Sequence, residues 1–155
     1  MEMVTAVTSR RAILFSIMTR KPNGLLHQDL TGQILGAFYG VYNELGSGFL
    51  EAVYEHALTK ELRTYGLKAD RQIPVTVNYR GRPTGFFRAD IVVEDKIVLE
   101  LKARSQIYPI HEVQLLNFLR ASKFEVGLLL NFGPEPRFKR LVFSNRRRAP
   151  MSKRH

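Results

Sequence analysis

The sequence predicts an α/β fold in which a mixed sheet of four to five strands is flanked by helices. Two amphipathic helical patterns come first, and apolar residues then alternate in the manner of an antiparallel strand meander between residues 72 and 99. A helical segment and a continuously apolar run over residues 124–132 follow, which predicts a crossover helix and a strand buried on both faces. The 155 residues suffice for one domain with its own core.

Apolar residues at spacings of three and four predict a first helix over residues 29–45 and a second over residues 49–65. We expect Gly46 to end the first helix in a left-handed conformation and Ser47 to be the N-cap of the second. Leu50 and Val53 are expected on the buried stripe of the second helix. Glu51 falls at the border of that stripe, where a carboxylate is usually solvated.

The remaining elements follow from alternation and turn residues. The first strand covers residues 72–79, where Pro74 indicates an edge position, and a turn at residues 80–83 leads to a strand that begins at Phe86. A polar turn at residues 94–96 separates the second and third strands. A helix beginning near Ile110 precedes the buried strand, and residues 138–144 are expected to form a last edge strand.

Three charged residues interrupt the apolar strands beside the turn at residues 94–96, namely Asp90, Glu100 and Lys102. If Val93 pairs with Ile97, Asp90 falls directly opposite Glu100, and Lys102 lies on the same face about 7 Å further along. Carboxylates that face each other at roughly 5 Å repel, so a purely structural strand pair would not be expected to carry them. A divalent cation would remove this repulsion, and these residue types are the parts of a metal-dependent phosphodiester hydrolase.

The charge balance favours a polyanionic partner. The chain carries 24 basic and 14 acidic residues, which gives a formal net charge of +10, and such an excess favours binding to nucleic acid phosphates. Only basic charges follow Glu135. Residues 145–155 are expected to be a disordered basic tail, which is either a nucleic-acid-binding arm or a solvated end that aids solubility.

Residues 1–26 are expected to be a flexible N-terminal extension. Arg10 and Arg11 before a short apolar run faintly resemble a twin-arginine export signal, and the shortage of acids faintly resembles an organellar transit peptide, but neither pattern is complete. Met18 as a second start is the preferred interpretation. The chain has no cysteine and no apolar run near the ~20 residues that a membrane span needs, so we expect a cytoplasmic protein without membrane contact.

Four segments carry a family resemblance. Asp90 followed by Glu100-Leu101-Lys102 resembles a D…(D/E)xK pattern, and the segment GFLEAVY at residues 48–54 matches GxxExxY. The other two are PIHEVQLLNFL at residues 109–119 and LLLNFG at residues 128–133. Together they resemble the GxxExxY protein family, a RecB-like branch of the PD-(D/E)XK nuclease superfamily. This resemblance implies a nuclease-like domain with a restriction-endonuclease-like core over residues 27–144.

The resemblance also implies an activity, namely metal-dependent hydrolysis of phosphodiester bonds, with DNA expected as the substrate rather than RNA. Asp90 and Glu100 would bind Mg²⁺ or Mn²⁺ with the carbonyl oxygen of Leu101, and Glu51 would add a further acid to the metal shell. All four are hard oxygen donors, which these ions prefer. Lys102 would orient or help deprotonate the attacking water and stabilise charge in the transition state.

The helix near residue 110 supplies further candidates. Gln114 and Phe118 occupy the positions of the family's QxxxY motif, so Gln114 is a catalytic candidate, whereas Phe118 lacks the hydroxyl and is expected to pack. His111 and Tyr54 are candidate accessory residues. His111 would either donate a proton near the scissile phosphate or cap its helix, and the second role is slightly preferred.

Two other functions compete with the nuclease. The first is a nucleic-acid-binding or assembly module that keeps the fold without effective catalysis, which Phe118 and the cationic tail favour. The second is a structural homodimer. Gly36 and Gly40 lie four residues apart on the first helix, a spacing that would allow close approach of a second copy.

Overall fold

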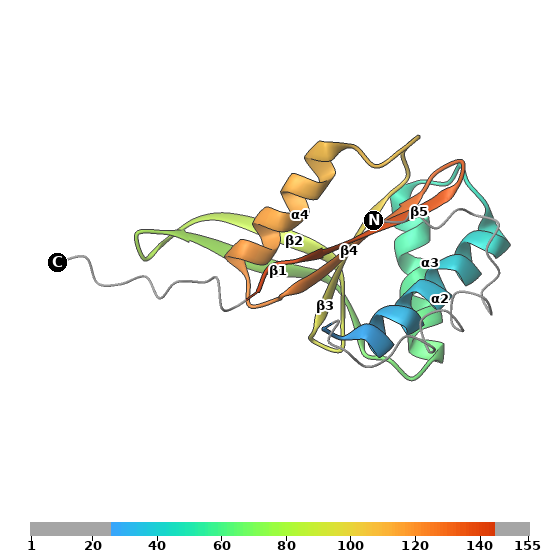
Figure 1. The fold of residues 1–155 in the computed structure, drawn as a ribbon, viewed down its shortest axis with the longest axis horizontal. Helices are drawn as coiled ribbons and strands as arrows, with labels where there is room; N and C mark the ends of the chain where they lie inside the picture. Colours follow the sequence, from blue (N-terminus) through green and yellow to red (C-terminus); the bar gives the residue numbers. More distant parts are fainter. Residues whose placement is uncertain (1–25, 145–155) are drawn as a thin grey trace.

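The computed structural model describes residues 26–144. The elements are α2 (Gln28–Leu45), α3 (Glu51–Thr64), β1 (Ala69–Tyr79), β2 (Arg82–Val93), β3 (Ile97–Lys102), α4 (Pro109–Ala121), β4 (Val126–Phe132) and β5 (Pro136–Val142). The strands form one sheet in the order β1-β2-β3-β4-β5, in which only β3 and β4 run parallel. Helices α2 and α3 cover one face and α4 covers the other (Figure 1).

This architecture confirms the predicted α/β class and the mixed sheet with its meander, crossover helix and buried strand. Every residue of β4 is buried, and the strand that contains Pro74 lies at a sheet edge as expected. β2 begins at Arg82 instead of Phe86, because its pairing with β1 continues out to the turn at residues 80–81. The predicted extension over residues 1–26 and the tail over 145–155 lie, except for Leu26, outside the described residues.

The junction between α2 and α3 differs from the expectation in two ways. Gly46 has the expected positive φ of 66°, but Ser47 is not the N-cap, because α3 begins only after Leu50, whose side chain offers no cap hydrogen bond. Leu50 is 80% exposed and Val53 40% exposed, against the prediction. The buried stripe of α3 includes Glu55 in place of these two residues. The buried residues are Tyr54, Glu55, Leu58, Thr59 and Leu62.

The paired strands β1 and β2 bend sharply at Gln72 and Asp90. Residues of the same parity share a face in a regular strand, yet Ala69 packs in the core beneath α2 and α3, whereas Ile73 packs against the core beneath α4. On either side of Asp90, Ala89 packs in the core beneath α4, whereas Ile91 packs in the core beneath α2 and α3. Gln72 has a φ of 55° and lies opposite Asp90 in the register. The bend therefore turns Asp90 away from the face that regular alternation would give it.

β2 and β3 separate close to this bend. Val93 pairs with Ile97 as predicted, but the ladder ends at the pair of Ile91 and Leu99. Beyond that pair β2 continues only with β1, and β3 continues only with β4. The prediction that Asp90 pairs directly with Glu100 is therefore wrong at the backbone level, because the bend pulls the two strands apart one residue earlier.

The glycine face proposed for a homodimer is not free in the single chain, since Gly36 is buried and Gly40 half-buried. Within residues 26–144, no helix combines the length and the apolar character that crossing a membrane requires.

Candidate active site

Asp90 and Glu100 meet where β2 and β3 separate. The Asp90 Oδ2 atom accepts a hydrogen bond of 2.8 Å from the backbone N–H of Leu101, and the backbone of Asp90 in turn hydrogen-bonds the Glu100 carboxylate. Each side chain thus takes up a backbone group of the opposite strand, in the place where the ladder would have continued. The arrangement holds two carboxyl groups close together at the opening of the sheet.

Both carboxyl groups have raised pKa values. Burial, and then the negative charge of Asp90, raise the pKa of Glu100 to about 8, against opposing effects of Lys102 and the backbone hydrogen bond. Burial also raises the pKa of Asp90, which Glu55 and Glu51 raise further while the bond from Leu101 lowers it. A cation would remove this unfavourable pairing of negative charges. The donors are hard oxygen atoms, so the residues fit Mg²⁺ or Mn²⁺.

Leu101 offers a backbone oxygen on the same side. The N–H and C=O groups of one strand residue point in the same direction within the sheet, and the Leu101 N–H points to Asp90. Its carbonyl oxygen therefore points into the opening between β2 and β3.

A pocket of about 190 Å³ lies on the α4 side of this opening. It brings together four predicted site residues, namely Glu100, Lys102, His111 and Gln114. Gln114 is exposed at the pocket, so its amide is free to meet a ligand from solution. The remaining lining residues are Phe87, Arg88, Leu115, Phe118 and Leu129. The pocket therefore combines a carboxylate, an ammonium group and an amide, which is a suitable set for a phosphate ester and a water molecule.

Glu51 lies at the exposed start of α3, close enough for its charge to raise the pKa values of Asp90, Glu100 and His111. It does not line the pocket. Across residues 26–144, no three histidine or acidic side chains converge tightly enough to form a metal-binding group. Glu51 therefore acts on Asp90 and Glu100 through its charge.

His111 performs the helix-capping role. Its Nδ1 atom accepts a 3.2 Å hydrogen bond from the backbone N–H of Tyr108, which is the N-cap residue of α4. This bond requires that the ring proton be on Nε2. Burial lowers the pKa of His111, and Lys102 and Arg104 lower it further, so the ring is neutral near pH 7. His111 still lines the pocket, where its other nitrogen is a potential hydrogen-bond donor.

Tyr54 supports the loop before Glu51 instead of reaching the pocket. Its hydroxyl donates to the carbonyl oxygen of Gly46 at 2.7 Å and accepts from the backbone N–H of Phe49 at 3.2 Å. Its ring stacks on Phe132 at a centroid distance of 4.2 Å. Tyr54 thus anchors the segment from which α3 and Glu51 begin.

The sequence patterns did not indicate the roles of two polar residues beside Asp90, namely Glu55 and Gln72. Glu55 is only 8% exposed, accepts a 2.8 Å hydrogen bond from Gln72 Nε2 and lies 3.3 Å from Arg71 Nε. Its charge acts on Asp90. Glu55 follows Glu51 by one helical turn, a spacing that signals a shared face, whereas no sequence pattern indicated the bend at Gln72.

Asn131 was also missed as a supporting residue. It is 1% exposed, and its side chain exchanges two 3.0 Å hydrogen bonds with the backbone N–H and C=O of Arg104. Asn131 pairs with Lys102 in the β3–β4 ladder, so it fixes the chain just after the lysine. A polar residue inside an apolar strand was the available signal, because a buried amide needs partners.

Comparisons with known proteins agree with this fold. Residues 28–141 match the family model described as the PD-(D/E)XK nuclease superfamily. The chain therefore belongs to that superfamily, whose members typically use divalent metals and act on nucleic acids. The solved structure titled "Crystal structure of SSO0001" is similar with a TM-score of 0.50 and 16% identity, over 86% of this chain and 75% of that chain, which shows the fold alone. No curated protein matches the sequence.

Proposed function

We propose that the protein is a metal-dependent nuclease of the GxxExxY, RecB-like branch, which hydrolyses phosphodiester bonds in DNA in preference to RNA. The observation that carries the proposal is the pair of half-buried carboxyl groups, Asp90 and Glu100, that exchange hydrogen bonds with each other's strand beside Lys102. A structural strand pair gains nothing from this pairing of like charges. Membership of the PD-(D/E)XK nuclease superfamily also supports a nuclease function.

Asp90, Glu100 and the carbonyl oxygen of Leu101 would hold Mg²⁺ or Mn²⁺, with Glu51 as an additional acid near the cation. When bound, such an ion lowers the pKa of a coordinated water and offsets the charge of the phosphate. Lys102 presents its ammonium group in the pocket, where it orients the attacking water and stabilises the negative charge that develops on phosphate oxygen. Gln114 donates a hydrogen bond to a phosphate oxygen from the pocket rim.

One observation favours a second candidate, a binding or assembly module with little catalysis. Phe118 stands where the family motif has tyrosine, and it is 3% exposed between Phe87 and Phe124, with ring centroids 6.2 and 6.5 Å away. It offers no hydroxyl to the pocket. Such a module would bind nucleic acid in a salt-dependent manner without turnover.

Cleavage assays decide between these functions. The full-length protein is incubated with labelled single-stranded, duplex and branched DNA and with RNA, in Mg²⁺, Mn²⁺ or EDTA. We expect metal-dependent cleavage, and at least a roughly 100-fold lower rate for Asp90→Asn, Glu100→Gln and Lys102→Met. The matched controls are Asp95→Asn and Lys96→Met, which change the same residue types in the exposed β2–β3 turn and leave the rate unchanged.

Cleavage that survives all three site substitutions would contradict the assignment of the site. Binding without cleavage of any substrate would support the second candidate instead.

A further inference from the structure

The outer part of the β1–β2 hairpin projects from the body of the protein (Figure 1). Beyond the bend, β1 and β2 pair only with each other, from Ile73 and Ala89 out to Tyr79 and Arg82. We call residues 73–88 the hairpin arm. Phe87 and Arg88, at the base of the arm, line the candidate active-site pocket. The arm therefore begins at the pocket and extends into solvent.

The two faces of the hairpin arm differ in what covers them. One face carries Ile73 and Val75, which are partly buried toward α4, and the more exposed Phe87, whose ring contacts Phe118. The opposite face carries Phe86 and Arg88, which pair with Thr76 and Pro74. Phe86 is 74% exposed. A large aromatic ring this exposed loses hydrophobic stabilisation unless a partner covers it.

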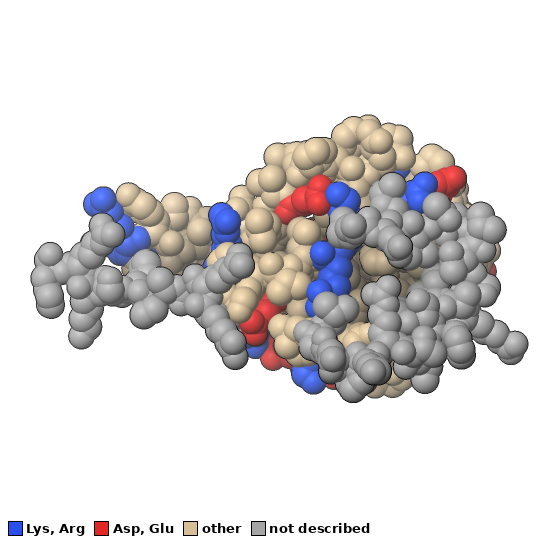
Figure 2. All heavy atoms as spheres, in the orientation of Figure 1, with Lys and Arg blue, Asp and Glu red and all other residues tan. Residues whose placement is uncertain are grey.

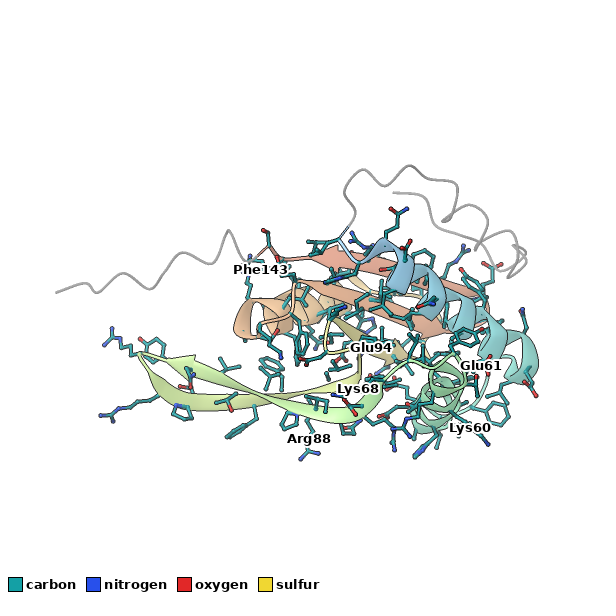
Figure 3. All side chains as sticks on the ribbon, turned by 90° about the horizontal axis from the view of Figure 1, so that it is seen from below. Lys60, Glu61, Lys68, Arg88, Glu94 and Phe143 are labelled. Atoms are coloured by element: carbon teal, nitrogen blue, oxygen red, sulfur yellow. The ribbon has the colours of Figure 1, made fainter. Side chains whose placement is uncertain are left out.

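The charge of the arm indicates the kind of partner. Residues 71–89 contain four arginines and no acidic residue. Arg80 and Arg82 flank the turn at the far end, where Figure 2 shows basic side chains. Figure 3 shows Arg88 on the same side of the molecule as Lys60 of α3. Lys60 lines a cleft of about 560 Å³ together with His56, Arg63 and Arg71. Basic groups thus extend from the tip of the arm to α3.

We infer that the hairpin arm binds the unpaired nucleotides of a single-stranded segment that leads to the active site, with bases stacked on Phe86 and phosphates on Arg80, Arg82 and Arg88. An exposed aromatic ring between cations is a combination that binds single strands, since any of the four bases can stack on the ring. Arg88 lies two residues from Asp90, or about 7 Å along the strand, and Phe86 about 13 Å. The inference rests on the proposed nuclease function and specifies its substrate as one with an unpaired region.

Binding measurements test the arm in the full-length chain carrying Asp90→Asn, in EDTA, so that the substrate stays intact. The probes are labelled oligo(dT) of 20 nucleotides and a 20-base-pair duplex, followed by fluorescence anisotropy. We expect Phe86→Leu to weaken binding of oligo(dT) about tenfold and binding of the duplex less than twofold. Phe86→Trp should retain the affinity for oligo(dT), because it keeps an aromatic surface, and Val142→Ala controls for loss of an exposed apolar group elsewhere.

The arginines at the tip have a control matched in charge. Arg80→Ala with Arg82→Ala should weaken binding of both probes and reduce the slope of log affinity against log salt by about 1.5. Lys68→Ala with Lys96→Ala removes the same charge at the opposite end of β1 and β2 and should have a much smaller effect. Equal effects of the two charge pairs, or a loss in Phe86→Leu that is the same for both probes or absent, would overturn the inference.

Failure of the arm and failure of the nuclease are distinguishable. If the wild-type chain cleaves but Phe86→Leu leaves its ratio of single-strand to duplex cleavage unchanged, the binding role of the hairpin arm is refuted and the nuclease function stands. If no substrate is cleaved but oligo(dT) binding depends on Phe86, the nuclease function is refuted and the binding role of the hairpin arm stands. Sedimentation at rising concentration tests whether Phe86 instead joins two copies of the chain, an outcome that would also refute the arm.

Discussion

At the scale of single residues, Glu100 carries a carboxyl group whose pKa lies far above its ordinary value. It is half-buried beside Asp90, and the loss of solvent and the charge of Asp90 raise its pKa from 4.5 to about 8, although Lys102 is nearby. A carboxyl group in such a place tends to keep its proton or to acquire a cation. Glu100 therefore couples the stability of the metal-free protein to pH.

The sign of this coupling follows from the two pKa values. Between pH 4.5 and 8 the folded state keeps a proton on Glu100 that the unfolded state has lost, so the stabilising contribution is complete below pH 4.5 and is lost as the pH rises to 8. In EDTA at pH 8.5, Glu100→Gln should be more stable than the wild type by at least about 1 kcal/mol, or roughly 4 °C in melting temperature. Near pH 4 the difference should be much smaller.

Thermal unfolding followed by circular dichroism at several pH values measures this difference. The Asp95→Asn chain serves as the comparison, since Asp95 is exposed and paired with Lys123. Equal stability of Glu100→Gln and the wild type at all pH values would contradict the raised pKa.

At the scale of elements, the site depends on how the ends of β3 and β4 are fixed to the next loop. Asn131 holds Arg104 through two hydrogen bonds, and Gly133 lies so close that an added Cβ would be 2.2 Å from the Arg104 carbonyl oxygen. Only glycine permits this approach. The loop that follows Lys102 is thus packed directly on the end of β4.

Gly133→Ala tests this packing. The added methyl group must displace the backbone of Arg104, so we expect a loss of about 2 kcal/mol in unfolding free energy, measured by urea denaturation. Gly85→Ala is the matched control, because an added Cβ there meets no atom within 4 Å, and it should change stability by less than about 1 kcal/mol. Equal midpoints for the two variants would show that the loop is not held as described.

At the scale of the whole molecule, metal binding and folding are linked, because Asp90 and Glu100 come from different strands and meet only in the folded sheet. Mn²⁺ at 100 times its dissociation constant should stabilise the protein by about 2.7 kcal/mol, or roughly 8 °C in melting temperature. The shift should disappear in Asp90→Asn and persist in Asp95→Asn. Scanning fluorimetry against an EDTA baseline measures it, and an undiminished shift in Asp90→Asn would place the ion elsewhere.

The sequence alone determined the element types, the sheet class and the charged residues of the hairpin, because these depend on apolar spacing within a few residues of the chain. The pairing of Val93 with Ile97 followed from turn length in the same way. His111 and Tyr54 were predicted as accessory residues, and their hydrogen bonds to Tyr108, Gly46 and Phe49 are contacts that spacing does not specify.

The tertiary structure alone decided the bend at Gln72, the separation of β2 from β3, and the inward turn of Glu55. A positive φ at a glutamine leaves no periodic trace in a sequence, and β2 and β3 separate at the bend that contains this glutamine. For this reason, the sequence placed Asp90 and Glu100 opposite each other on paired backbones, whereas packing joins their side chains across an opening.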